Sequence, residues 1–298
     1  MPAMKLDNIL AIADRDDPRQ FAVRAALELL PAATGRLRVV GFAHEHAAAE
    51  PGLLSATAAA ALQRALLADK RRWLRRSVAA QLPGDGRSRI EAVWAADIVD
   101  WVVEAVPRDG IDLVVKAGHR SDNLFYTPTD WRLLRRCPVP VLIAGSKPRG
   151  KSRRILATID AGSTDPVQIG LNRKVLAAAA HLGAVLGARV HAAYVIPVST
   201  VAQDLDLIDI EALERRTRAK LDAPLTALVG EHGIPPENVV VKAGPPDRLL
   251  PSIAARLKAD IVVMGTVGRT GAAGRLLGNT AEQVLHRLHT SMLALRPD

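Results

Sequence analysis

The chain has 298 residues, 49% of them hydrophobic, which is enough for two globular domains of roughly 150 residues each. It lacks an apolar run of the ~20 residues needed to span a bilayer, and its start lacks the apolar segment of a signal peptide, so we expect a cytoplasmic protein. Cys137 is its one cysteine, so we expect no internal disulfide. The net charge of +9 admits nucleic acid or an acidic surface as a partner, but aromatic residues, at 3%, leave few platforms for stacking bases.

The first half alternates apolar runs of β type with stretches of helical periodicity. We expect strands at residues 9–13, 37–42, 89–94, 112–116 and 139–144, and helices at residues 21–30, 56–82 and 98–106. The fourth strand is apolar almost throughout, as a strand buried on both faces should be.

The second half repeats this alternation. We expect strands at residues 154–159, 189–195, 238–242, 260–264 and 291–295, and helices at residues 167–186, 207–230 and 247–257. Alternating strands and helices indicate a parallel sheet with helices on both faces. Right-handed crossovers favour a doubly wound sheet of five strands in each half, although the strand order cannot be read from the sequence.

The two halves are copies of one unit. The segment at 9–14 is echoed at 155–160, and the segment at 111–115 is echoed at 259–263. Residues 145–152 are rich in Gly, Pro, Ser and charge, which predicts a linker between a domain at 1–147 and a domain at 152–298. The last strand of each domain is short and apolar, and pairing these two strands would protect both edges.

A glycine-rich loop distinguishes the second copy from the first. Gly265 and Gly268 follow the fourth strand, and nine residues separate Gly268 from Gly278, whereas the first copy has almost no glycine there. Glycines let main-chain amides approach phosphate oxygens, and the start of the next helix adds free N–H donors. Arg269 and Arg275 could supplement these amides. The spacing fits neither the dinucleotide fingerprint nor the Walker A motif.

Each of these residues also has a purely structural interpretation. The glycines could serve only the turns of a flexible connection. Thr280 with Gln283 forms a capping-box pattern, so Thr280 could simply cap its helix. Asp160, which ends the first strand of the second copy, could likewise cap the helix that follows.

Three further features are interpreted as structural. The basic stretch 70–76 is expected to form a solvated helix face, and Lys116 is expected to extend from a buried strand to solvent. Cys137 is expected to be structural. The eight histidines lack the spacing of a zinc-ligand set, so we expect no metal site.

The spacing Gly-x2-Gly-x9-Gly, the aspartate at 160 and the tandem arrangement resemble the universal stress protein family. The segments at 125–131, 265–271 and 277–282 resemble its tandem-type members most closely. The resemblance implies two α/β domains of the adenine-nucleotide α-hydrolase type, joined through their last strands as an internal pseudo-dimer.

The resemblance also implies ATP binding wherever the glycine pattern is kept. Asp160 would face the adenine or ribose, and Gly265, Gly268 and Gly278 would hold the phosphates. The family usually has Ser or Thr directly after the last glycine, whereas this chain has Asn279 followed by Thr280. The first domain lacks the glycines, so we expect no nucleotide there.

These observations predict a stress-response sensor or adaptor that binds ATP in its C-terminal domain without efficient turnover, and they leave a weak ATPase activity open. Two alternatives remain. The Ala- and Leu-rich helical segments 56–67 and 176–186 would suit a carrier of an apolar or amphipathic metabolite. The positive charge would suit an interaction scaffold, for which nucleic acid is the less favoured partner. Protein partners and a higher oligomer are left open.

Overall fold

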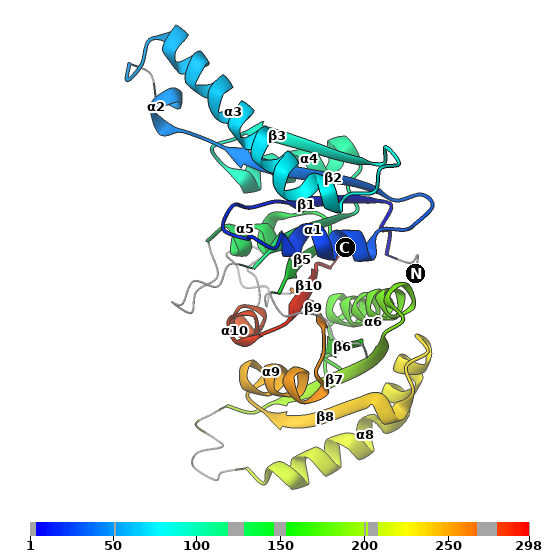
Figure 1. Cartoon of the computed structure of the whole chain (residues 1–298). Coiled ribbons are helices and arrows are strands. Elements are labelled where there is room, and N and C mark those ends of the chain that lie inside the picture. The colour runs from blue at the N-terminus through cyan, green and yellow to red at the C-terminus, as the bar shows by residue number, and fades with distance from the viewer. Residues whose placement is uncertain are drawn as a thin grey trace. The chain divides into compact units, whose positions relative to one another are not determined.

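A computed structural model of the chain describes residues 4–50, 52–118, 128–145, 153–199, 201, 208–266 and 279–297. The chain divides into two compact units, and the division falls between Ala144 and Gly145 (Figure 1). None of the described helices is long and apolar enough to cross a membrane. Each unit is an α/β domain, and each is described in turn.

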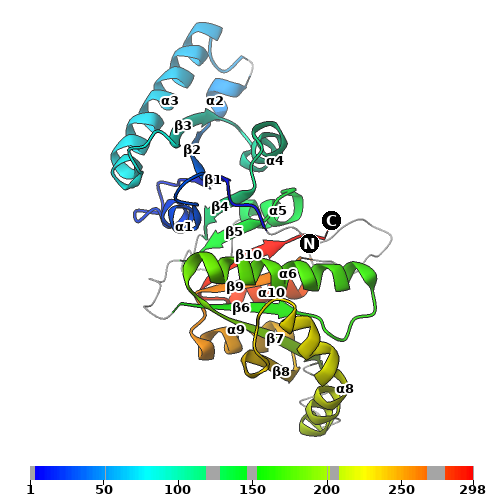
Figure 2. The same ribbon diagram turned by 90° about the vertical axis from the view of Figure 1, so that its right-hand side faces the viewer.

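The first domain is a doubly wound parallel sheet of five strands in the order β3-β2-β1-β4-β5. Helices α1 and α3 contact the sheet on one face, and α4 and α5 lie together on the other (Figure 2). Its elements are β1 (Asn8–Ile12), α1 (Phe21–Leu29), β2 (Arg36–Ala43), α2 (His46–Ala49), α3 (Ala56–Val78), the 3₁₀ turn η1 (Ala79–Gln81), β3 (Ser88–Trp94), α4 (Ile98–Asp109), β4 (Leu113–Ala117), α5 (Pro128–Arg136) and β5 (Val141–Ala144).

The second domain repeats this topology in the order β8-β7-β6-β9-β10. Helix α6 contacts β6, β7 and β9, α8 contacts β8, and α9 packs beside α10. Its elements are β6 (Arg154–Ile159), α6 (Pro166–Leu186), β7 (Arg189–Pro197), α8 (Ile210–Gly230), the 3₁₀ turn η2 (Pro236–Asn238), β8 (Val239–Gly244), α9 (Pro246–Leu257), β9 (Ile261–Gly265), α10 (Asn279–Arg287) and β10 (Ser291–Leu295). The fold class predicted from the sequence is confirmed.

The central strands form the core of each domain. Ile9 of β1 pairs with Leu113 of β4, and Ile155 of β6 pairs with Ile261 of β9, so the two copies share one register. All four side chains are at most 1% exposed, because strands in the middle of a doubly wound sheet are covered on both faces. Leu176 and Leu182 of α6 belong to the same core and are fully buried.

Local signals in the sequence set the helix ends. The side chains of Ser55, Asp97, Asp165 and Asp209 accept hydrogen bonds from main-chain amides in the first turns of α3, α4, α6 and α8. Helices α4 and α6 end at Gly110 and Gly187, which have φ angles of 61° and 60°. Glycine adopts this left-handed conformation without steric cost, so these ends could be read locally.

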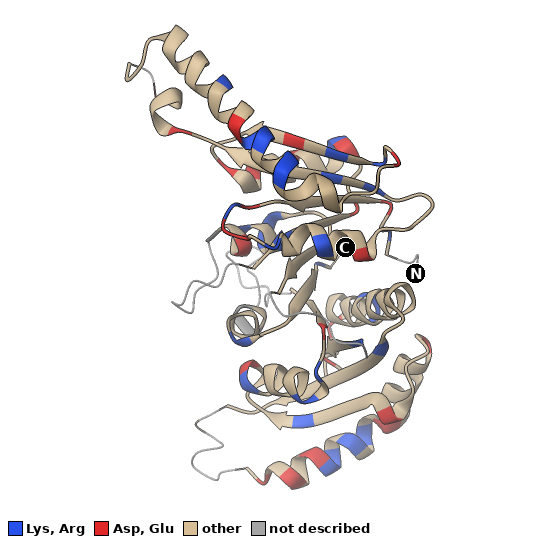
Figure 3. Cartoon of the chain, viewed as in Figure 1, with Lys and Arg blue, Asp and Glu red and all other residues tan. Residues whose placement is uncertain are grey.

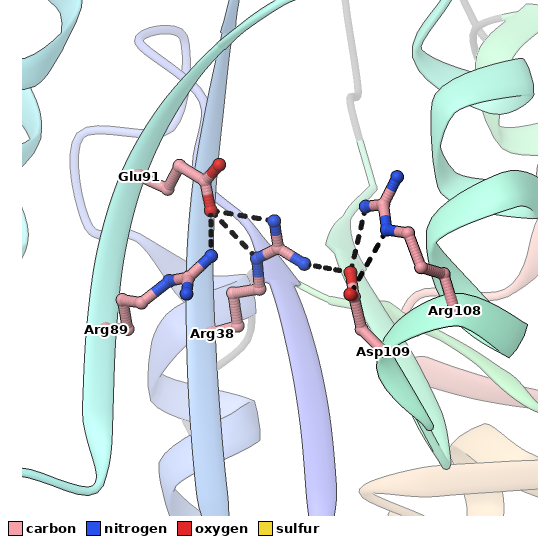
Figure 4. Close-up of polar contacts among 5 residues, drawn as sticks. All are labelled: Arg38, Arg89, Glu91, Arg108 and Asp109. Carbon is pink, nitrogen blue, oxygen red and sulfur yellow. Dashed lines mark hydrogen bonds and ion pairs between the residues drawn. The ribbon is translucent and has the colours of Figure 1, made fainter.

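An alternating chain of charges ties two strands of the first domain to α4 (Figure 4). Glu91 of β3 accepts from Arg38 and Arg89 at 2.7 Å each, and Arg38 also pairs with Asp109, which accepts from Arg108 at 2.9 Å. The hydrogen bond from Arg108, followed by that from Arg38, holds the pKa of Asp109 below its usual value. Arg38 and Arg89 lie near the amino ends of β2 and β3, and Asp109 ends α4 before β4 begins, so the chain of charges is away from the edge where parallel sheets bind ligands.

Candidate functional site

In the second domain, Asp160 and Gly265 lie at the carboxyl ends of neighbouring strands. Thr158 of β6 pairs with Met264 of β9, so Asp160 comes two residues after this pair and Gly265 one residue after it. The chain runs from β6 toward β7 on one side and from β9 toward β10 on the other, so the strand order reverses between β6 and β9. Doubly wound sheets bind ligands in the crevice at such a switch point.

The backbone of Asp160 is held by one side chain of α6. Asn172 Nδ2 donates to the Asp160 carbonyl oxygen at 2.7 Å, and Asn172 Oδ1 accepts from the Asp160 amide at 3.0 Å. Gln168 donates to the same Oδ1 at 3.0 Å. Asn172 is only 4% exposed, so this amide is a buried clamp that fixes where the strand ends.

The carboxylate of Asp160, by contrast, is exposed and makes no hydrogen bond or ion pair with any residue that the structure describes. It does not cap the next helix, because Asp165 accepts from the Val167 amide at 3.0 Å and performs that role. The capping interpretation of Asp160 is therefore wrong.

Tyr194 of β7 braces the turn that follows Asp160. The Gly162 amide hydrogen-bonds the Tyr194 oxygen, and a Cβ at Gly162 would collide with that oxygen, so a larger residue there would require Tyr194 to move. Burial raises the pKa of Tyr194, and the negative charge of Asp160 raises it further. The turn is thus held by Asn172 on one side and by Tyr194 on the other.

Gly265 has a packing role that the sequence did not indicate. A Cβ there would overlap the Leu171 side chain of α6, with Leu171 Cγ only 2.7 Å away. The next residue, Thr266, directs both its amide and its hydroxyl to the Leu295 carbonyl oxygen, at 2.8 and 3.1 Å. The Thr266 amide therefore extends the sheet and is not free for an anion.

The side chains of the remaining residues predicted to bind phosphate are not described by the structure. Gly268, Arg269 and Gly278 lie outside the described residues. Asn279 and Thr280 are the first two residues of α10, and their side chains are not described. The start of α10 thus follows the loop as expected, while the contacts of the loop stay a prediction.

At the corresponding edge of the first domain, side chains contact one another. Asp14, the counterpart of Asp160, accepts from the Asp16 amide at 3.3 Å, and Arg15 pairs with Asp69 of α3. The Lys70 ammonium lies 5.1 Å from the Trp73 ring centre, and Arg15 lies 5.8 Å from it. Burial lowers the pKa of Lys70, and the nearby charge of Arg15 lowers it further.

Lys116 is buried, contrary to the expectation that it reaches solvent. Its ammonium lies 2.7 Å from Asp130 Oδ1, and the two side chains are 4% and 0% exposed. Lys116 is the fourth residue of β4, and Asp130 is the third residue of α5. In the second domain, the corresponding positions of β9 and α10 carry Met264 and Ala281. A buried ammonium requires a partner because desolvation without one is costly, and α5 supplies it.

Sequence reasoning did not find Asn172, Tyr194 or Asp130. A buried asparagine and a buried aspartate inside otherwise apolar helix faces are detectable signals, since such groups need a partner. Their partners lie on other elements, so the pairing itself could not be read. Among the described residues, no group of three or more His, Cys, Asp or Glu side chains could hold a metal ion.

Comparisons with known proteins agree with this architecture. A profile of the universal stress protein family matches residues 5–145 and 152–296. Universal stress protein E of Escherichia coli K12 is 30% identical over 98% of this chain and 94% of its own, and the Haemophilus influenzae homolog is 29% identical over 99% and 98%. A functionally unknown protein from Pseudomonas aeruginosa is 26% identical, with a TM-score of 0.72 over 98% of this chain and 93% of its own.

Proposed function

The chain belongs to the universal stress protein family, with two such domains in tandem, and on that premise we propose that its second domain binds ATP without efficient turnover. One observation carries the proposal. The exposed carboxylate of Asp160, which has no partner among the described residues, stands at the switch point of the second sheet, where Gly265 ends the neighbouring strand.

Each residue of the proposed site has a chemical role. A carboxylate accepts hydrogen bonds from ribose hydroxyls or the adenine amino group, so Asp160 holds the nucleoside. Main-chain amides around Gly265, Gly268 and Gly278, with Asn279 and Thr280 at the start of α10, hold the phosphates, and Arg269 adds a charge. Asn172 and Tyr194 position Asp160 without touching the nucleotide.

The first domain, residues 1–147 in this proposal, has no nucleotide partner. Arg15 pairs with Asp69, Lys116 is paired with Asp130, and the first copy lacks the glycines of the second. The stoichiometry is therefore one ATP per chain, bound by the domain at residues 152–298. The protein acts in the cytoplasm as a sensor or adaptor whose state depends on bound nucleotide.

Isothermal titration calorimetry with ATP and Mg²⁺ tests the proposal. We expect one site per chain, and a large loss of affinity in Asp160→Asn and in Gly268→Val. Asp14→Asn is the matched control, because it makes the same change at the equivalent position of the first domain and should leave the affinity unchanged. Absence of heat with ATP, or equal losses in Asp160→Asn and Asp14→Asn, would refute the site.

A further inference from the structure

Helix α3 of the first domain presents a row of arginines to solvent. We call Arg64, Arg71, Arg72, Arg75 and Arg76 the arginine face; all five are exposed. Arg72 pairs with Asp69 at 3.4 Å, and the other four form no ion pair with any part of the chain that the structure describes. The positive charge of these four arginines is therefore not neutralised by any described residue of the domain.

The spacing places three of these side chains in one line. Arg64, Arg71 and Arg75 stand at positions i, i+7 and i+11, which share one side of a helix. They rise along the axis by about 10 Å and then about 6 Å. A partner that follows this line meets several cations in succession.

The second domain shows that the fold does not require this charge. Helix α8 occupies the same place between the second and third strands, and each helix buries two residues, Leu74 and Val78 in α3 and Leu225 and Val229 in α8. Helix α3 has six basic residues and one acidic residue, whereas α8 has four and three. Both red and blue segments occur along α8 in Figure 3, while blue dominates the charged part of α3.

An exposed apolar segment continues the arginine face toward the start of α3. Leu53 and Leu54 are 58% and 37% exposed, and Ala58, Ala60 and Ala61 face solvent on the first turns of the helix. This end of α3 extends beyond the strands of its own sheet, beside α2 (Figure 1). Cationic and apolar groups therefore adjoin on one helix.

We propose that the arginine face, together with Leu53, Leu54 and the exposed alanines, binds an acidic amphipathic segment of another protein. Carboxylates of the partner pair with the arginines, and its apolar residues cover the leucines and alanines. Nucleic acid fits less well, because Trp73, the aromatic residue of α3, is already flanked by Arg15 and Lys70. A lipid surface fits less well because alanines insert little apolar area.

The test uses a fluorescein-labelled synthetic peptide of Glu and Leu that forms an amphipathic helix, with the glutamates on one face and the leucines on the other. Fluorescence anisotropy measures its binding to the full chain, with salt raised from roughly 50 to 200 mM. We expect Arg71→Ser/Arg75→Ser to weaken binding about tenfold and Leu53→Ser/Leu54→Ser to weaken it severalfold. The salt dependence should be shallower in the arginine variant.

Arg216→Ser/Arg218→Ser on α8 is the matched control, since it removes two exposed arginines from the equivalent helix of the second domain. Equal weakening by both arginine pairs would overturn the proposal, because net charge alone would then explain binding. Tighter binding of single-stranded RNA or of phosphatidylglycerol vesicles, or no peptide binding at all, would also overturn it. Circular dichroism verifies that each variant is folded. We expect all of them to fold, because the changed positions are exposed.

Discussion

Lys116 and Asp130 form a buried ion pair, 2.7 Å apart, at positions where the second domain carries Met264 and Ala281. One copy of the repeat thus joins its fourth strand to the following helix by charge, whereas the other copy has buried apolar residues at both positions. Burying an ion pair costs nearly as much as the attraction returns, so the two solutions can be of similar stability.

The first prediction replaces the buried ion pair of the first domain with the apolar residues of the second. Lys116→Met alone, or Asp130→Ala alone, should lower the free energy of unfolding by about 3–5 kcal/mol, because each leaves an uncompensated buried charge. The double variant Lys116→Met/Asp130→Ala should be close to the wild type. Urea denaturation of all four proteins gives the coupling energy. Additive losses in the double variant would contradict the prediction.

A second prediction concerns Gly265. Gly265→Ala should lower the free energy of unfolding by about 1–3 kcal/mol, because the new methyl group displaces the buried Leu171 side chain. Gly170→Ala is the control: nothing lies within 4 Å of a Cβ there, and it stands inside α6, so it should raise stability by roughly 0.5–1 kcal/mol. Thermal unfolding compares the two variants. Stabilisation by Gly265→Ala would contradict the prediction, because it would show that the Leu171 side chain can make room for the new methyl group.

The third prediction separates two arginines that share Glu91. The Arg38 side chain is 14% exposed, pairs with Glu91 and Asp109, and lies 5.1 Å from the Trp101 ring centre, whereas Arg89 is 68% exposed. Arg38→Ala should cost about 1–3 kcal/mol of unfolding free energy, since it removes buried stem contacts and takes one partner from each of two carboxylates. Arg89→Ala should cost less than about 1 kcal/mol. Denaturant titration measures both, and equal costs would argue against a central role for Arg38.

The fourth prediction concerns pH. Burial lowers the pKa of His191 on β7, and the charges of Arg189 and Arg154 lower it further. The unfolded chain then binds a proton at a higher pH than the folded chain does, so the free energy of unfolding should fall as the pH drops below about 6.5. His191→Gln should flatten this slope between roughly pH 6.5 and 5.

Urea titrations at several pH values measure that slope. A double variant that also carries His232→Gln should be flatter still, because burial lowers the pKa of His232 as well. A slope in His191→Gln as steep as in the wild type would assign the proton uptake to another group.

The sequence by itself determined the duplication, the alternation of strands and helices, and the edge at which Asp160 and Gly265 lie. These properties depend on local periodicity, on turn residues and on the rule that parallel strands end together. The start of α3 at residue 56 could also be read, because Ser55 caps the helix that follows it, whereas α4 runs to Asp109, past the expected end at residue 106. Reading the strand order was beyond such rules.

The tertiary structure alone decided which side chains meet. It gave Lys116 a partner on α5, gave the Asp160 backbone a clamp from Asn172, and let Leu171 occupy the space beside Gly265. Such contacts join residues on different elements, and they depend on how helices pack against the sheet, which no short-range pattern encodes. Burial then sets the chemistry, because a charge that would be solvated on an isolated strand must find an opposite charge inside a packed domain.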